Sequence, residues 1–167
     1  METKEEKQTI AKQARNMKVR GQRNNNPLNI IISKSYWVGK INDPSEKKDN
    51  RFEEFTDMKY GIRAAVKLLQ NYIRKGWDTV PVIIKRWCPD ETAPSYTAYV
   101  LGRMKGYFPD FEKHKPIRWY DFETLMRLVQ AMSKLESQYE ITDAEFLEAW
   151  QELDNANRSN RKKKEEQ

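Results

Sequence analysis

Apolar side chains recur with helical spacing along the chain, and this pattern constrains the fold more than any other feature. In residues 58–75 one face of a helical wheel holds Met58, Ile62, Ala65, Val66, Leu69 and Ile73. Residues 121–135 show a second apolar stripe, and Asp121 is suited to cap that helix. A period of 3.6 residues is typical of helices that bury one face. The sequence therefore predicts a mainly α fold.

Shorter helices and one hairpin complete the predicted architecture. Thr142 and Glu145 have the spacing of a capping box, which opens a helix that runs to about Leu153. Residues 36–38 and 51–55 are predicted to form two short strands. Further helices are expected in residues 4–19, 78–87 and 95–105.

The formal net charge of +6 is concentrated at the two ends of the chain. Residues 1–23 carry +4 and residues 157–167 carry +3, whereas residues 24–156 carry −1. Net charge therefore argues against a basic nucleic-acid-binding body, and we expect nucleic acid to bind at most weakly, through the termini. We expect a basic helical arm in residues 1–20 and a disordered basic tail in residues 157–167.

Composition excludes several further classes of protein. Cys88 is the single cysteine, which excludes an internal disulfide and a cysteine-rich zinc site, and we expect no metal or cofactor. His114 is the single histidine, so any catalytic pair that needs histidine would have to use it. No apolar run approaches the ~20 residues of a membrane span, and the first residues contain no apolar segment of secretory-signal length.

Glu136 is the acidic residue with the clearest catalytic pattern. On a helical wheel it lies in the centre of the apolar stripe that includes Leu125 and Met132. A carboxylate there must be desolvated, paired or facing a cleft. Desolvation raises a carboxyl pKa, as a general acid for glycosidic cleavage requires. Two structural alternatives stay open: a frayed helix end that reaches water, or an ion pair with Arg63 or Arg86.

The asparagine run in residues 23–30 is the second feature of interest. Its side-chain amides are typical of a polar loop that binds a sugar, with Asn24, Asn25, Asn26 and Asn29 as the candidate binding residues. The alternative is a tight turn that the asparagine side chains hold through their own hydrogen bonds.

Aromatic side chains near predicted loops are candidates to line a sugar-binding cleft. They are Tyr36, Trp37, Trp87, Tyr96 and Tyr99. Aromatic side chains at helical spacing are more often part of the core. Glu91, beside the chain break at Pro89, is an alternative carboxylate, although an acidic residue at the start of a helix is usually a favourable charge–dipole feature.

Matches to one recurrent sequence pattern run through about residues 20–153. The pattern reads RGxRNNNPGNI, WxG, FxxF, GxRAAxxLLxxY, TxxxIIxxWAP and AxSKxE. Its counterparts here are Arg20-Gly21, Arg23 to Pro27, Asn29-Ile30, Trp37, Gly39, Phe52, Phe55, Gly61, Arg63 to Ala65, Leu68-Leu69, Tyr72, Thr79, Ile83-Ile84, Trp87, Pro89, Glu91, Tyr99, Ala131, Ser133-Lys134 and Glu136. In these residues the chain resembles a family of phage and prophage proteins, common in Bacteroidetes, described as virion structural or peptidoglycan-hydrolase-like proteins.

The resemblance implies a lysozyme-like helical domain over residues 21–156, with a small β-hairpin. In many wall glycosidases the helix that ends in the catalytic Glu comes first, whereas here the polar loop precedes it. We therefore hypothesise a circular permutation that folds Glu136 back beside residues 24–29. The implied partner is the glycan strand of peptidoglycan, cut by a glycosidase or lytic transglycosylase. Glu136 would be the general acid, and Trp37 and Tyr99 would line the cleft.

The resemblance leaves a second function open, a non-catalytic virion structural protein that keeps the fold and contacts other virion proteins. It implies synthesis in a bacterial cytoplasm without a signal peptide, followed by virion association or release at lysis. Glu91 is the candidate if a second carboxylate takes part in catalysis. The family's glycine after the proline is Leu28 here. If that glycine has a positive φ or lets a ligand approach, Leu28 introduces strain or blocks the site.

Overall fold

The fold is built from helices, as the apolar periodicity predicted. The computed structural model describes the backbone of residues 3–166 and the side chains of residues 3–9 and 19–166. The helices in this part of the chain are α1 (Lys4–Arg23), α2 (Met58–Arg74), α3 (Val80–Trp87), α4 (Ala93–Tyr107), α5 (Phe122–Ser137) and α6 (Asp143–Glu165). The mainly α class is confirmed, and so are the expected cap at Asp121 and the capping box of Thr142 and Glu145.

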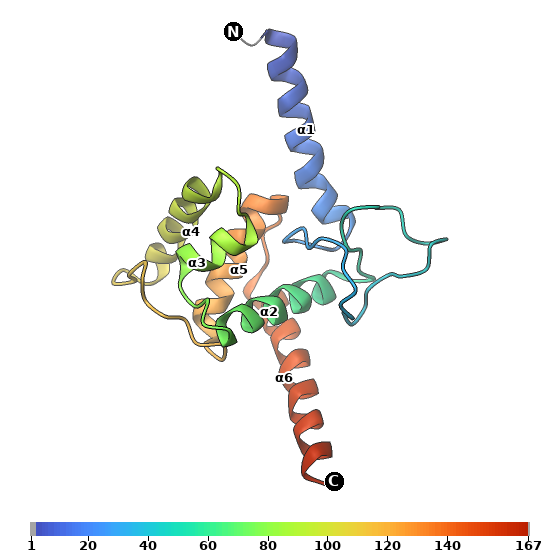
Figure 1. The fold of residues 1–167 in the computed structure, drawn as a ribbon, viewed down its shortest axis with the longest axis vertical. Coiled ribbons are helices and arrows are strands. Elements are labelled where there is room, and N and C mark those ends of the chain that lie inside the picture. The colour runs from blue at the N-terminus through green and yellow to red at the C-terminus, as the bar shows by residue number, and fades with distance from the viewer. Residues whose placement is uncertain (1–2, 167) are drawn as a thin grey trace.

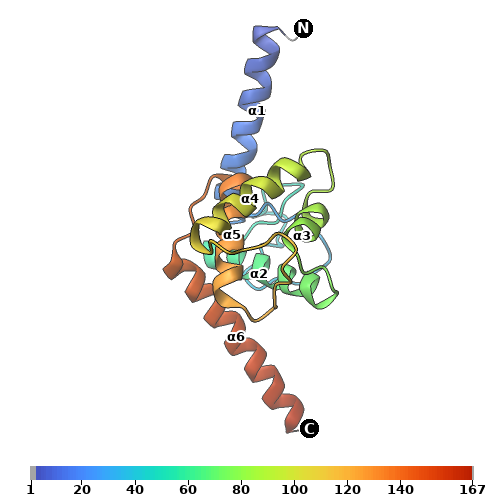
Figure 2. The same cartoon turned by 90° about the vertical axis from the view of Figure 1, so that its left-hand side faces the viewer.

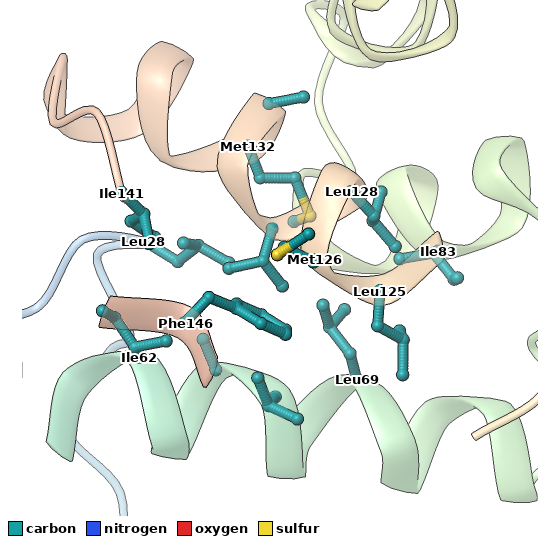
Figure 3. Close-up of a cluster of buried hydrophobic side chains, with 14 of the residues drawn as sticks. Leu28, Ile62, Leu69, Ile83, Leu125, Met126, Leu128, Met132, Ile141 and Phe146 are labelled. Carbon is teal, nitrogen blue, oxygen red and sulfur yellow. The ribbon is translucent and has the colours of Figure 1, made fainter. Parts of the chain in front are cut away.

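The hydrophobic core forms where α5 meets its neighbours. Helix α5 packs against α1, α2, α4 and α6, and α2 packs most extensively against α6. Figure 3 shows Leu69 of α2, Leu125 of α5 and Phe146 of α6 pointing into one cluster, and all three are fully buried. The predicted apolar stripes of the two long helices therefore face each other across the core.

Two helices project from this body in opposite directions (Figures 1 and 2). Helix α1 contacts the body through its last turn, where the Gln22 side chain donates a hydrogen bond to the Ser137 carbonyl at 2.8 Å. Helix α6 packs on α2 through its first half and extends beyond the body through its second half. No helix of residues 3–166 combines the length and the apolar character that crossing a bilayer requires.

The C-terminal part of α6 corrects the expectation of a disordered tail. We predicted a helix end near Leu153 and disorder from residue 157, whereas α6 continues to Glu165. An ion pair of Asp154 with Arg158 at 3.2 Å, four residues apart, supports the helix at this point. Lysines in its last turn also favour the helix, because they complement the negative end of the helix dipole.

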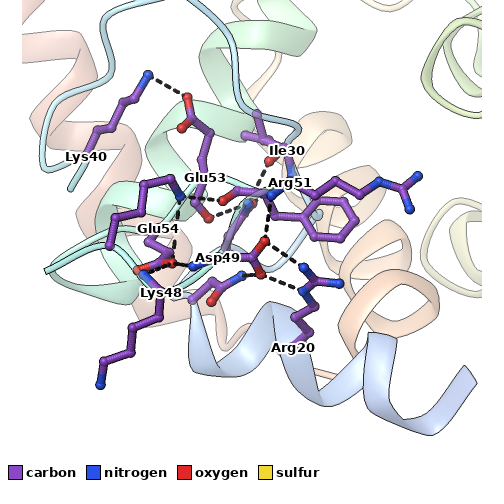
Figure 4. A network of polar contacts seen from close by, with 12 residues as sticks. Arg20, Ile30, Lys40, Lys48, Asp49, Arg51, Glu53 and Glu54 are labelled. Atoms are coloured by element: carbon purple, nitrogen blue, oxygen red, sulfur yellow. Dashed lines mark hydrogen bonds and ion pairs between the residues drawn. The ribbon is translucent and has the colours of Figure 1, made fainter. Parts of the chain in front are cut away.

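The predicted hairpin is replaced by an irregular loop between α1 and α2. Isolated antiparallel bridges join Ile31 to Phe52 and Lys40 to Phe55, in place of the two expected strands. Side chains supply much of the loop's hydrogen bonding, as Figure 4 shows around Asp49. These side-chain bonds take the place of a regular strand ladder.

Asp49 is the centre of that polar network. Its carboxylate accepts hydrogen bonds from Arg20 at 2.5 Å, from Asn24 at 2.8 Å and from two backbone N–H groups of the loop. Burial alone would raise the pKa of Asp49, but these hydrogen bonds outweigh it and hold the pKa well below its ordinary value. The network ties the end of α1 to the loop.

Candidate active site

Glu136 lies in the last turn of α5, where the predicted apolar stripe reaches the helix end. The helix continues past it to Ser137 and ends at Gln138, which adopts the left-handed conformation with φ 57°. The helix is therefore not frayed at Glu136, whose side chain is half-buried. Of the two arginines expected as alternative partners, Arg63 pairs with Glu152 at 3.1 Å and Arg86 stacks on an aromatic ring.

A cleft of about 360 Å³ lies beside Glu136. Its lining residues are Cys88, Thr92, Ser95, Tyr96, Leu135 and Glu136. The walls therefore come from the junction of α3 with α4, the first turns of α4 and the last turn of α5. Among the described residues, no group of three or more His, Cys, Asp or Glu side chains is placed to hold a metal ion.

Asp90 shapes the junction that forms one wall of the cleft. Its carboxylate accepts hydrogen bonds from the Thr92 backbone N–H at 2.8 Å, from the Thr92 hydroxyl at 2.5 Å and from the Cys88 thiol at 3.4 Å. Hydrogen bonds from Thr92, with a further one from Cys88, lower the pKa of Asp90. Asp90 is therefore ionised at neutral pH and presents a negative charge near the cleft.

Glu136 has the opposite protonation behaviour. Burial raises its pKa to about 7, the Asn29 side chain opposes this increase, and the charge of Asp90 adds to it. Burial also raises the pKa of Tyr96 well above its ordinary value. Near pH 7 one carboxyl group at the cleft thus holds a proton for much of the time while its neighbour stays ionised. This division is the one that acid catalysis by a carboxyl group requires.

Asn29 is the member of the asparagine run that reaches Glu136. Its backbone is left-handed, with φ 52°, and its Nδ2 donates a hydrogen bond to the Glu136 carbonyl oxygen at 3.0 Å. This contact joins residues 107 positions apart in the chain. Asn29 Oδ1 is buried and has no hydrogen-bond partner in the described part of the chain. The loop and the end of α5 therefore meet, as the permutation hypothesis requires.

The other three asparagines hold the loop itself together. Asn24 Nδ2 donates to the Asp49 carboxylate, and Asn25 Nδ2 donates to a backbone carbonyl at 3.0 Å. Asn26 is fully buried and forms three side-chain hydrogen bonds with the loop backbone. A Cβ at Gly61 would lie 1.9 Å from the Asn25 carbonyl oxygen, so glycine lets the loop seat directly on α2.

Three other candidate residues lie outside the lining of the cleft. Trp37 is buried and lines a separate hollow with residues of α2 and α6. Tyr99 accepts a hydrogen bond from Arg103 at 3.0 Å, and Tyr96, three residues earlier on α4, lines the cleft in its place. Glu91 is exposed.

The carboxylate whose charge acts on Glu136 is Asp90, which was not among the candidate residues expected from the sequence. The order Asp90-Glu91-Thr92 carries a signal for it, because an Asp two residues before a Thr at a helix start commonly accepts hydrogen bonds from it. No local pattern predicts that Asp90 lies near Glu136, because the two residues are 46 positions apart in the chain.

Leu28, at the position where the sequence pattern it resembles has glycine, neither strains the loop nor lines the cleft. Its side chain is fully buried in the cluster with Ile62 and Phe146 (Figure 3). The left-handed conformations of the described loop residues other than glycine fall at Asn25 and Asn29 instead. A side chain at position 28 therefore contributes to the core without a conformational penalty.

Comparison with known proteins points to a phage origin. No protein-family model matches the chain. Part of the chain is similar to Protein P5 of Pseudoalteromonas phage PM2, with 39% identity over 80 residues. The aligned region is 46% of this chain and 48% of Protein P5, so the chain spans about half the length of that relative. The chain is therefore a distant, partial homologue of a phage protein.

Proposed function

We propose that the protein binds and cleaves the glycan strands of peptidoglycan, with Glu136 as the general acid. One observation carries the proposal: a half-buried carboxyl group faces a cleft, and burial raises its pKa to about 7. A group with this pKa is protonated often enough at neutral pH to donate, and its carboxylate is basic enough to accept the proton back. No cofactor is required for such a reaction.

The proposed reaction uses one protein carboxyl group and the substrate's own nucleophile. Glu136 gives its proton to the glycosidic oxygen as the bond from that oxygen to the anomeric carbon breaks. A hydroxyl group of the same sugar then attacks the anomeric carbon, and its proton passes to the Glu136 carboxylate. The product is an internally cyclised sugar, formed without water. Asp90 raises the pKa of the acid by its charge, and Asn29 holds the backbone at Glu136.

We further propose a lysozyme-like fold with a permuted order of parts for residues 21–156. The contact of Asn29 with Glu136 supports this proposal, because it brings the polar loop to the end of the acid-bearing helix. Residues 1–20 and the end of α6 would then be additions outside the domain. Among the candidate asparagines, the proposal gives Asn29 the role of positioning the backbone at Glu136, whereas Asn24, Asn25 and Asn26 bind the loop itself.

A non-catalytic virion structural protein is the second candidate function. It is favoured by the use of three asparagine side chains for internal hydrogen bonds, which leaves fewer groups to hold a sugar. The similarity to a phage protein is compatible with both functions, and virion association is proposed for either.

The test is digestion of purified peptidoglycan by the wild type and by Glu136→Gln. We expect soluble muropeptides from the wild type and a loss of at least ~100-fold in rate for Glu136→Gln. Glu91→Gln is the matched control, since it makes the same change at an exposed position of the neighbouring loop. Products lighter by one water than those of hydrolysis identify the cyclised sugar. Equal release by wild type and Glu136→Gln would rule out the acid, and no release by the wild type would favour the structural function.

A further inference from the structure

Two hollows meet at Asn160, in the part of α6 that projects from the body. The larger has a volume of about 410 Å³ and lies between α6, the end of α2 and the loop at Trp119. The smaller, of about 240 Å³, lies against the outer face of α2. Their cationic lining residues are Arg63, Lys67, Arg74, Arg161 and Lys164. Asp154 is the acidic side chain that lines them, and Glu152 pairs with Arg63 at 3.1 Å, so the excess positive charge comes from the other four cations.

The cations of the larger hollow lack acidic partners. Asp154 is engaged by Arg158 at 3.2 Å, on its own helix. Arg74, Arg161 and Lys164 have no carboxylate within 4.0 Å in the part of the chain that the structure describes. Three unpaired cations around one hollow attract anions, and a phosphate group is a strong ligand for arginine.

The hollow also presents an aromatic ring in a defined position. Trp119 is 36% exposed, and its backbone carbonyl accepts a hydrogen bond from the buried Gln70 side chain at 2.9 Å. The Arg74 guanidinium lies 4.4 Å from the Trp119 ring centroid, and the Tyr120 ring meets it edge-on at 5.3 Å. These contacts hold the ring at the surface, beside the unpaired cations.

The helical state of residues 157–165 fixes the geometry of the charges. Arg161 and Lys164 are three residues apart, so they lie on the same side of α6 and line the same hollow. Asn157 and Asn160 lie on that side as well and add amide groups able to donate hydrogen bonds. A disordered tail with the same composition would supply charge without this arrangement.

We propose that this surface binds a single strand of nucleic acid. Its phosphates would contact Arg74, Arg161 and Lys164, and a base would stack on Trp119. Basic grooves with aromatic platforms are the general means of binding single strands without sequence preference. The second hollow, with Lys67 and its aromatic neighbour Tyr36, continues the surface past Asn160. The net charge of the body does not oppose this binding, because the cations are gathered locally.

The test measures fluorescence anisotropy of a labelled 15-nucleotide DNA strand with the full-length protein over a range of salt concentrations. We expect the triple variant Arg74→Gln, Arg161→Gln, Lys164→Gln to weaken binding at least tenfold. We also expect it to reduce the slope of log affinity against log salt by about 2, as three lost phosphate contacts imply for single strands. The variant Trp119→Ala should weaken binding roughly tenfold, through lost stacking.

The matched control is Lys48→Gln, Lys85→Gln, Lys105→Gln, which removes three exposed charges away from both hollows. It should change the affinity less than twofold. Glu136→Gln should bind like the wild type, which separates this inference from the proposed cleavage. Circular dichroism of each variant checks that the helices are retained.

Three results would overturn the proposal. They are absence of binding at 50 mM salt, equal losses in the two triple variants, and equal affinity for the duplex form of the same DNA. Inorganic polyphosphate and wall teichoic acid serve as competitors. If either displaces the DNA at equal phosphate concentration and Trp119→Ala has no effect, the surface binds polyanions in general and the assignment to nucleic acid is wrong.

Discussion

Asp49 and Glu136 are both withdrawn from water, and their pKa values move in opposite directions. Asp49 is 7% exposed and accepts hydrogen bonds from Arg20, from Asn24 and from the loop backbone, which keep it ionised. Glu136 is more exposed, yet burial without comparable donors raises its pKa to about 7. The difference shows that the supply of hydrogen-bond donors, rather than burial alone, decides which carboxyl group is charged. One of these groups therefore stabilises the fold, and the other is available for chemistry.

The largest expected effect is the loss of the Asp49 network. Asp49→Ala removes the buried carboxylate that accepts hydrogen bonds from Arg20, from Asn24 and from two backbone N–H groups, so we expect the free energy of unfolding to fall by about 3 kcal/mol. Urea denaturation at pH 7 measures this loss of unfolding free energy. Asp43→Ala, in the same loop, should cost much less than Asp49→Ala, because the Asp43 carboxylate is exposed to water. Because the pKa of Asp49 is lowered on folding, its contribution is present above about pH 4 and is lost as the pH falls further. A cost no larger than that of Asp43→Ala would contradict the comparison.

Glu136→Gln should change the stability in the opposite direction, because it should stabilise the protein at high pH. Folding raises the pKa of Glu136 from 4.5 to about 7. The contribution of this carboxyl group to folding stability is therefore fully present below pH 4.5, and it is lost as the pH rises through 7. The substitution removes the penalty of a desolvated charge at high pH. We expect Glu136→Gln to be more stable than the wild type by up to ~3 kcal/mol at pH 8, and equally stable at pH 4. A Glu136→Gln variant less stable than the wild type at pH 8 would refute the desolvated acid.

The smallest effects should come from the two groups that adjust the pKa of Glu136. Asn29→Gly removes the amide that lowers this pKa, while glycine accepts the left-handed backbone, so the pKa should rise. Asp90→Asn removes a negative charge, so the pKa should fall. Carbon-13 NMR titration of the Glu136 carboxyl group measures both. Asn25→Gly, also left-handed at φ 50° and bonded to the Phe55 carbonyl, is the matched control and should leave the midpoint unchanged. Shifts of the same sign in both variants would contradict these roles.

The sequence predicts best what depends on near neighbours in the chain. Helices α2 and α5 were expected from apolar periodicity, and the caps at Asp121 and Thr142 from side chains that bond within three residues. The loop between α1 and α2 was less predictable. Its form depends on the contact of Asp49 with Arg20, 29 positions away, and no local pattern encodes that pair.

The candidate site divides in the same way. Periodicity placed Glu136 on the apolar stripe of α5, because the helix continues to Ser137. Tyr96 reaches the cleft, and the charge of Asp90 comes near Glu136, through the packing of α4 on α5, which the spacing of residues does not show. The end of α6 is an instance where local pairs, such as Asp154 with Arg158, outweighed a polar composition that we had interpreted as disorder.

The projection of α1 has a mechanical consequence for the cleft. At 1.5 Å per residue this 20-residue helix is about 30 Å long, and the hydrogen bonds that its described side chains make with the body come from its last turn. The helix therefore resembles a lever: its long part projects from the body, and its short part is the last turn, which contacts the body. A swing that moves its outer end by several ångströms displaces the contact of Gln22 with Ser137 by a small fraction of that distance. The residue next to Glu136 is thus insulated from movement at the far end of the lever.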